Sequence, residues 1–136
     1  MNEVTSSLEA FEALKSLTNP YAEELWVIAL GPQLQILGKE MIFRGTADHC
    51  LTHPRDIFRF LIMQNACAFM MAHNHPSGTV LPSEQDLLIT RRMHTCGDLF
   101  QMPLLDHIIF NMERYFSMAD NGYFKQWKKR SRREKI

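Results

Sequence analysis

The stretch CAFMMAHNHPSGTVLPSEQD, residues 67–86, decides the fold, because it joins an apolar segment to a turn and a helix start. Residues 67–72 are too few for a helix and are apolar on both faces, which predicts a buried central strand. Residues 76–78 (Pro-Ser-Gly) predict a turn. Ser83 can cap a helix that follows. A strand that leads through a turn into a helix is the repeating unit of α/β proteins.

The same stretch carries the side chains of a candidate metal site. His73 and His75 are two residues apart at the end of the expected strand, so both imidazoles share one face. Asp86 is the third residue of the helix capped by Ser83, and its carboxylate lies near that helix start. If the loop folds back over the strand end, Asp86 supplies a third ligand. Two histidines, one carboxylate and one open position are typical of hydrolytic zinc sites.

Each of these signals also has a simpler interpretation. Ser83-x-x-Asp86 by itself is a helix capping pattern, and a single histidine at a strand end is an ordinary polar residue. The combination of His73, His75 and Asp86 favours the metal site. Zinc bound there would lower the pKa of a bound water toward about 7 and polarise a carbonyl group.

The segments before this stretch predict a helix and a hairpin. Ser6 and Glu9 form a capping pattern for an N-terminal helix. Its expected apolar stripe recurs every three residues, at Leu8, Phe11, Leu14 and Leu17. Residues 25–30 and 34–43 predict two strands that are joined by a Gly-Pro-Gln turn.

Helices and strands alternate along the rest of the chain. A helix is expected from Pro54, with Ile57, Leu61 and possible contributions of Phe58 and Ile62 to its buried face. The helix after Ser83 spans about fifteen residues, with Leu87, Leu88, Met93 and Leu99 as candidate core residues. Residues 104–110 and 115–118 predict strands, and a last helix runs into the C-terminal tail. This order predicts an α/β fold, a mixed sheet flanked by helices in α-β-α layers.

Length and composition place the chain among cytoplasmic globular proteins. Its 136 residues suffice for one domain, with 46% hydrophobic and 22% charged residues. No segment reaches the roughly 18 apolar residues of a membrane span, and the N-terminus lacks the features of a secretory signal. Three cysteines without a C-x-x-C pair fit a reducing compartment and argue against a cysteine zinc site. We therefore expect a cytoplasmic protein without membrane contact.

The charges are unevenly distributed although their sum is zero. From Lys125 onward the chain has seven basic residues and one acid, net +6, so the preceding residues sum to −6. Such a run is most often a solvated, disordered end. The alternative is a nonspecific DNA contact through the basic tail, with Trp127 as a possible stacking group.

The motif His73-x-His75-x7-Ser83-x-x-Asp86 resembles the JAMM (MPN+) metalloprotease motif, and HNHPSG followed by PSEQD is similar to the bacterial RadC family. Further similar segments are FRGT (residues 43–46), HPR (53–55), LDH (105–107) and YFS (115–117). Together they cover about residues 20–124. The resemblance implies the JAMM/MPN fold, a cytidine-deaminase-like architecture. The expected organisation is an N-terminal helix (1–20), a RadC-like JAMM domain (21–124) and a basic tail (125–136).

The resemblance also implies roles for single residues. His73, His75 and Asp86 would bind Zn²⁺, and Ser83 would hydrogen-bond the tetrahedral intermediate or the bound water. JAMM enzymes use a glutamate as general base near the first strand. Glu23 is the preferred candidate, followed by Glu24 and, with less support, Glu40. Because neighbouring strand residues face opposite ways, only one of the first two can point at the metal.

Two hypotheses from different classes follow. The first is a zinc-dependent hydrolase of the JAMM type that cleaves a peptide or isopeptide bond in an unknown protein or peptide substrate. The second is a noncatalytic metal module that binds DNA or a protein partner in repair or mobile-element biology. A zinc deaminase is disfavoured, because it needs a C-x-x-C pair beside H-x-E. Asp106 and His107 are either a satisfied core pair or support for the metal ligands.

Overall fold

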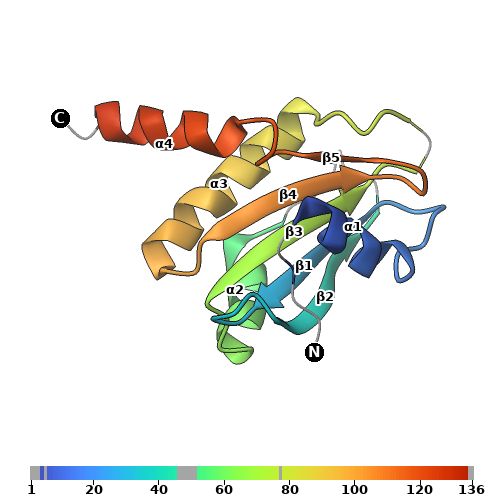
Figure 1. Cartoon of the computed structure of the whole chain (residues 1–136), viewed down its shortest axis with the longest axis horizontal. Coiled ribbons are helices and arrows are strands. Elements are labelled where there is room, and N and C mark those ends of the chain that lie inside the picture. The colour runs from blue at the N-terminus through green and yellow to red at the C-terminus, as the bar shows by residue number, and fades with distance from the viewer. Residues whose placement is uncertain (1–3, 5, 46–51, 77, 135–136) are drawn as a thin grey trace.

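The computed structural model describes residues 4, 6–45, 52–76 and 78–134, which form one mixed sheet with helices around it (Figure 1). The helices are α1 (Ser7–Lys15), α2 (Pro54–Met63), α3 (Glu84–Phe100) and α4 (Tyr123–Glu134). The strands are β1 (Glu24–Leu30), β2 (Ile36–Arg44), β3 (Ala68–Asn74), β4 (Leu104–Phe110) and β5 (Tyr115–Ser117). The predicted order of elements is confirmed.

The sheet has the strand order β2-β1-β3-β4-β5, so β3 lies at its centre. β1 is antiparallel to both β2 and β3, whereas β3 and β4 are parallel and are connected through α3. All seven residues of β3 are buried, as the apolar segment predicted. The strand continues two residues past Ala72, which carries His73 into the sheet.

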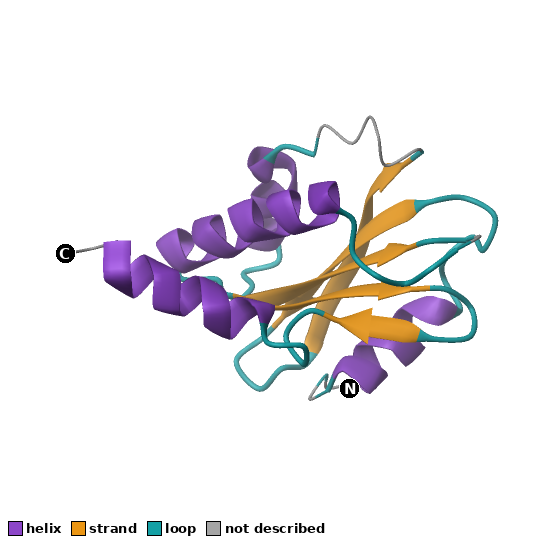
Figure 2. Cartoon of the chain, turned by 90° about the horizontal axis from the view of Figure 1, so that it is seen from above, coloured by secondary structure: helices purple, strands orange, loops and turns teal. Residues whose placement is uncertain are grey.

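Helices cover both faces of the sheet, and the predicted α-β-α layering is confirmed. Figure 2 shows α1 on one side and the other three helices on the opposite side. On the α1 side, Phe11 and Leu14 pack against Met70, Ile108 and Phe110. The core of the other side gathers residues of α2, α3 and α4, among them Ile57, Leu61, Met93 and Trp127.

Some of the predicted core residues are exposed. Leu8 is 52% exposed at the edge of the α1 stripe, because a three-residue repeat drifts by about 60° per step around a helix of 3.6 residues per turn. Leu17 is 48% exposed and lies beyond α1, which ends at Lys15. Leu88 and Leu99 are 71% and 78% exposed, and Ile62 is 58% exposed, so these three assignments were wrong. The apolar periodicity of a sequence does not show how much of a helix surface the sheet covers.

The basic tail differs from the expectation of a disordered end. Its residues as far as Glu134 continue the helix α4. Trp127 is buried and its ring stacks on Phe124, with the two centroids 5.4 Å apart. His94 of α3 contacts both rings. Trp127 therefore anchors the helix, and the idea that it stacks on nucleic-acid bases was wrong.

Two further sequence expectations concern cysteines and membranes. Cys67 and Cys96 are free thiols, and Cys50 lies outside the described residues, as does Thr46 of the FRGT segment. Within the described part of the chain, none of the helices has the length and apolar character that a membrane crossing requires.

Candidate metal centre

The two histidines meet at the end of the central strand. His73 is the sixth residue of β3, and His75 follows directly after the strand. The backbone N–H of His75 donates to Phe110 O of β4 at 2.8 Å, which continues the parallel ladder for one residue. The imidazole rings of His73 and His75 are edge to face, with centroids 4.9 Å apart. The even spacing on an extended backbone thus brings both rings to one side of the sheet.

Asp86 reaches the histidines from the first turn of α3. Ser83 caps this helix: its hydroxyl oxygen accepts from the Asp86 N–H at 3.1 Å, and Asp86 Oδ2 accepts from the Ser83 N–H at 2.9 Å. This capping box fixes the direction of the carboxylate. The Asp86 side chain therefore completes the helix cap and also faces the two histidines.

The carboxylate of Asp86 lies at the distance of a neighbouring metal ligand from each histidine. Asp86 Oδ1 lies 3.2 Å from His73 Nδ1, and Asp86 Oδ2 lies 3.4 Å from His75 Nε2. Ligands of a tetrahedral zinc ion, with bonds near 2.0–2.2 Å, are about 3.3–3.5 Å apart. One donor atom from each of the three residues lies within 4.8 Å of the others, and all three residues are at least half-buried. This group can hold a metal ion.

Hydrogen bonding prepares His75 as a ligand. Its Nδ1 lies 2.9 Å from Thr79 O, and because a carbonyl oxygen only accepts, Nδ1 carries the hydrogen. Neutral His75 then presents the lone pair of Nε2 to the site. A backbone carbonyl on the far nitrogen is the usual way in which proteins orient a metal-binding histidine. Thr79 belongs to the turn between β3 and α3, so the turn itself orients the ring.

The charges within the group stabilise one another. Burial alone raises the pKa of Asp86, but hydrogen bonds from His73, His75 and the Ser83 backbone outweigh it and hold the pKa well below its usual range. The bond to Asp86 raises the pKa of His75, against the opposing effect of burial. The carboxylate is therefore ionised at neutral pH.

Glu23 lies beside this group. It directly precedes β1, and its Oε2 is 3.7 Å from His73 Nε2. The side chain is 28% exposed, so solvent reaches it while it faces the histidine. This is the place at which a general base would stand, and that role stays a prediction.

The other two candidate glutamates point elsewhere. Glu24 is buried on the opposite side of the strand, where its carboxylate accepts from Arg44 at 2.6 Å and from the Trp26 indole at 3.0 Å. Burial alone raises the pKa of Glu24, but the bonds from Trp26, Arg44 and Asn19 lower it below the usual value. Glu40 is exposed on the edge strand β2, where it faces residues of α2.

Asn74, between the two histidines, positions the Glu23 segment, and sequence reasoning missed it. Its side-chain amide donates to Ala22 O at 2.8 Å and to Asn19 O at 3.2 Å, and its oxygen accepts from the Glu24 N–H at 2.7 Å. These bonds hold the backbone on both sides of Glu23. The sequence did contain a signal for this role. Asn74 is a polar residue in a strand whose two faces are both buried, so its side chain must find hydrogen-bond partners.

Asp106 and His107 have separate roles in β4. Asp106 accepts from the Ser117 hydroxyl at 2.5 Å and from the Ala119 N–H at 3.0 Å, so it is a satisfied core acid. His107 instead contacts the Thr90 hydroxyl, one helical turn after Asp86. Burial and the nearby His73 lower the pKa of His107 to about 3, so the imidazole is neutral. Of these two residues, only His107 is connected to a candidate ligand, because the Thr90 hydroxyl that it contacts also bonds to Asp86 O.

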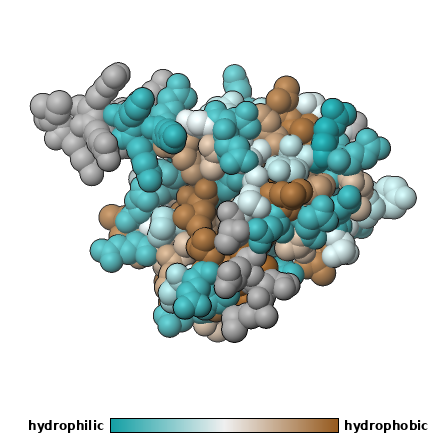
Figure 3. Space-filling model, viewed as in Figure 1, coloured by the Kyte–Doolittle hydropathy of each residue, from teal (hydrophilic) through white to brown (hydrophobic). Residues whose placement is uncertain are grey.

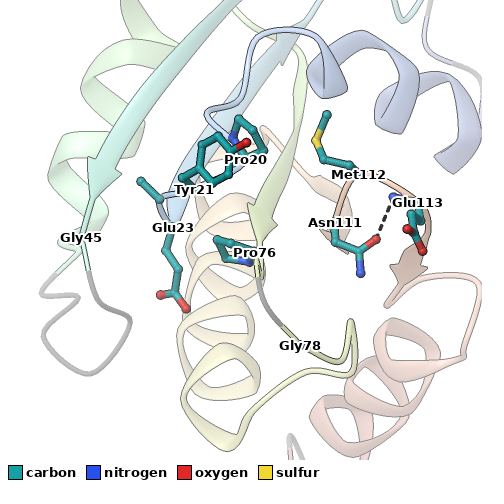
Figure 4. Close-up of a pocket in the computed structure, with 10 residues that line it drawn as sticks. Pro20, Tyr21, Glu23, Gly45, Pro76, Gly78, Asn111, Met112 and Glu113 are labelled. Atoms are coloured by element: carbon teal, nitrogen blue, oxygen red, sulfur yellow. Dashed lines mark hydrogen bonds between the residues drawn. The ribbon is translucent and has the colours of Figure 1, made fainter.

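A cavity of about 1010 Å³ opens beside the site, lined by Pro20, Tyr21, Ala22, Glu23, Gly45, Pro76, Gly78, Asn111, Met112 and Glu113 (Figure 4). Figure 4 shows Glu23 on one side of Pro76, while Asn111 and Glu113 lie on the other side. Glu23 thus joins the cavity to the histidine group.

Comparisons with known proteins identify the family of this chain. The family model described as a RadC-like JAB domain matches residues 4–123. UPF0758 proteins of Thermotoga maritima, Staphylococcus carnosus and Enterococcus faecalis are 36%, 40% and 37% identical over 88%, 75% and 90% of this chain. These alignments cover 54%, 45% and 53% of the relatives, so the chain spans about half their length. The mixed sheet with flanking helices is the α/β fold expected of JAB/MPN domains, and the chain belongs to the RadC-like JAB domain family.

Proposed function

We propose that this protein is a zinc-dependent hydrolase that cleaves a peptide or isopeptide amide bond in a protein or peptide substrate. The observation that carries the proposal is the convergence of His73, His75 and Asp86, whose candidate ligand atoms lie within 4.8 Å of one another. Nitrogen and carboxylate donors in this ratio suit zinc. Free Cys67 and Cys96 fit the further proposal that the protein works in the reducing cytoplasm.

The residues divide the chemistry between them. His73, His75 and Asp86 would hold the zinc ion, which when bound acidifies a water and polarises the substrate carbonyl. Glu23 accepts a proton from the attacking water and returns it to the leaving amine. Its partial exposure and its place at the rim of the cavity allow it to meet both groups. The cavity holds the substrate chain next to that carboxylate.

Ser83 is proposed to assist the reaction with its hydroxyl hydrogen. The hydroxyl oxygen already accepts from the Asp86 N–H, but the hydroxyl group can still donate. The side chain is exposed, so a substrate oxygen can approach it. In this proposal Ser83 stabilises the negative charge that develops on the former carbonyl oxygen.

Zinc content and peptide cleavage test the function together. Protein purified without added zinc is analysed for metal and then incubated with a mixture of synthetic peptides, with products read by mass spectrometry. We expect about one zinc per chain and cleavage that Glu23→Gln reduces by about 100-fold or more while zinc is retained. Glu40→Gln is the matched control and keeps full activity. A Glu23→Gln protein with full zinc and full cleavage would contradict the assignment of the base.

A second candidate function is a noncatalytic role in nucleic-acid binding, and α4 supports it. Phe124 and Trp127 anchor this helix, so Lys125, Lys128 and Lys129 are exposed on a fixed scaffold. The part of α4 that is visible in Figure 3 is mainly hydrophilic. Clustered lysines on a docked helix can contact successive phosphates of a duplex without reading its sequence.

Substitution tests this contact better than deletion, because removing residues 125–136 would also remove Trp127 from the core. We expect Lys125→Gln, Lys128→Gln and Lys129→Gln together to weaken binding to a fluorescent DNA duplex and to lower its salt dependence by up to about 2.7 units of slope. The control neutralises exposed Lys39, Arg55 and Arg92. Equal weakening by both triple variants would show a general charge effect and contradict a site on α4.

A further inference from the structure

A chain of hydrogen bonds behind Asp86 connects α3 to the neighbouring strand. The Thr90 hydroxyl lies 2.5 Å from Asp86 O, and on its other side it contacts His107 Nδ1 of β4. Thr90 and His107 are both buried. This chain leads from β4, the neighbour of the central strand, to the backbone of the candidate metal ligand.

The direction of each hydrogen bond follows from the acceptors. Asp86 O is a carbonyl oxygen and cannot donate, so the hydrogen in its contact with Thr90 comes from the threonine hydroxyl. That hydroxyl has no second hydrogen to give to His107. The imidazole must therefore donate from Nδ1, and the order of donation is His107, Thr90, Asp86.

The other ring nitrogen supports this assignment. His107 Nε2 is a buried side-chain nitrogen without a hydrogen-bond partner among the described residues. A hydrogen placed there would be buried without an acceptor, which costs more than a buried lone pair. His107 is therefore neutral with its hydrogen on Nδ1, and in this form it always donates to Thr90.

A second threonine of α3 shows what the histidine adds. Thr95 makes the same type of bond, from its hydroxyl to Arg91 O at 3.1 Å, but it is exposed. Such a bond to the carbonyl four residues earlier is common for threonine in helices and has little effect by itself. At Thr90 the hydroxyl is also tied to β4, the strand parallel to the one that carries His73. The helical turn that carries Asp86 is therefore held in place relative to β4 and, through the pairing of β4 with β3, relative to the strand of His73.

We infer that Thr90 and His107 are positioning residues, which set the Asp86 carboxylate relative to His73 and His75 for metal binding. The inference rests on the proposed metal site and deepens it. The capping box orients the carboxylate from the solvent side, and the Thr90–His107 pair holds the same residue from the core side. A ligand that is held from both sides loses little freedom when a metal binds.

The test compares zinc affinity in folded variants. Thr90→Val removes the hydroxyl and keeps the shape, Thr90→Ser keeps the hydroxyl, and Thr95→Val is the matched control. Zinc dissociation constants come from competition with a chelator, and the geometry of the site from the visible spectrum of the cobalt-substituted proteins. We expect Thr90→Val to weaken zinc binding by about 10-fold or more and to change the cobalt spectrum. Thr90→Ser and Thr95→Val should resemble the wild type.

The outcomes separate this inference from the proposed function. If Thr90→Val is folded and matches the wild type in zinc affinity and cobalt spectrum, the positioning role is wrong while the metal site stands. If the wild type itself binds no zinc after reconstitution, both are overturned. Equal weakening by Thr95→Val would show a general effect on α3 and would also overturn the inference. Should Thr90→Val not fold, Thr90→Ala takes its place, because alanine has the higher helix propensity.

Discussion

The two sides of the candidate site are built differently. On the α3 side, both carboxylate oxygens of Asp86 have partners, and the Ser83 cap and the Thr90 hydroxyl hold its backbone. On the β1 side, Glu23 meets His73 across 3.7 Å, and it is the backbone around it that Asn74 holds. Asp86 is thus held at both its carboxylate and its backbone, whereas at Glu23 the bonds from Asn74 hold the neighbouring backbone.

This difference matches the two tasks that we propose. A metal ligand has to stay in place, because displacement weakens binding steeply. A general base has to serve first the attacking water and then the leaving group, so a backbone that is held firmly beside the site suits it. Metal binding and proton transfer should therefore respond to different substitutions.

The largest effect is expected when the Asp86 carboxylate on the α3 side is removed. Asp86→Ala should lower the zinc content from about one per chain to background, because it removes one of three ligands and leaves only the two imidazoles. Metal analysis of the purified protein measures this. Asp98→Ala is the control, since Asp98 lies on the same helix and pairs only loosely with His94, at 3.8 Å. Full zinc in Asp86→Ala would remove Asp86 from the ligand set.

The next largest effect is expected on the β1 side, when the side-chain amide of Asn74 is removed. Asn74→Ala should lower the free energy of unfolding by about 3 kcal/mol, because three hydrogen bonds are lost at a buried residue, at about 1 kcal/mol each. Zinc affinity should change little, whereas peptide cleavage should fall. Denaturant unfolding and chelator competition measure the two quantities.

Asn121→Ala is the control for this change, because its amide donates one bond, to Ser117 O, from an exposed position. A loss of zinc affinity in Asn74→Ala as large as the loss in Thr90→Val would show that the two sides are not separable.

A smaller effect concerns the pH dependence of the core behind Asp86. Burial lowers the pKa of His107 to about 3, whereas a histidine in the unfolded chain titrates near its model value of 6.5. Between these pH values the unfolded state binds the additional proton, so stability falls as the pH falls below 6.5. This one group should reduce the free energy of unfolding by about 2 kcal/mol between pH 7 and pH 5.

His107→Asn measures this contribution, because its amide can still donate to Thr90 but does not titrate. The free energy of unfolding of metal-free protein, taken at several pH values, should fall less steeply in the variant than in the wild type. Parallel pH profiles of the two proteins would mean that His107 takes up a proton without being unfolded.

The smallest effect concerns His75 and the pH dependence of the stabilisation by zinc. The bond to Asp86 raises the pKa of His75, so this group stabilises the metal-free protein below pH 6.5 and loses that contribution as the pH rises through its folded pKa. A metal must displace that proton. The rise in Tm on adding zinc should therefore be a few degrees larger at pH 8 than at pH 6. Equal rises at both pH values would show that His75 holds no competing proton.

Much of the site could be read from one stretch of sequence. An extended backbone puts residues two apart on the same side, which brings His73 and His75 together, and the capping pattern puts Asp86 near the helix start. Thr90 and Asn74 were missed because their partners are distant in sequence. A threonine inside a helix and an asparagine inside a strand look unremarkable until His107 and the Ala22 segment are placed beside them.

The sequence by itself determined the order of the elements, the buried central strand and the three candidate ligands, because these depend on local periodicity and capping. Only the tertiary structure decided which of Glu23 and Glu24 faces the histidines. Neighbouring residues at a strand start point to opposite sides, and the pairing of β1 with β3 sets which side each one takes. The structure also decided that Trp127 anchors α4, because only the packing of α4 on α3 brings His94 against its ring.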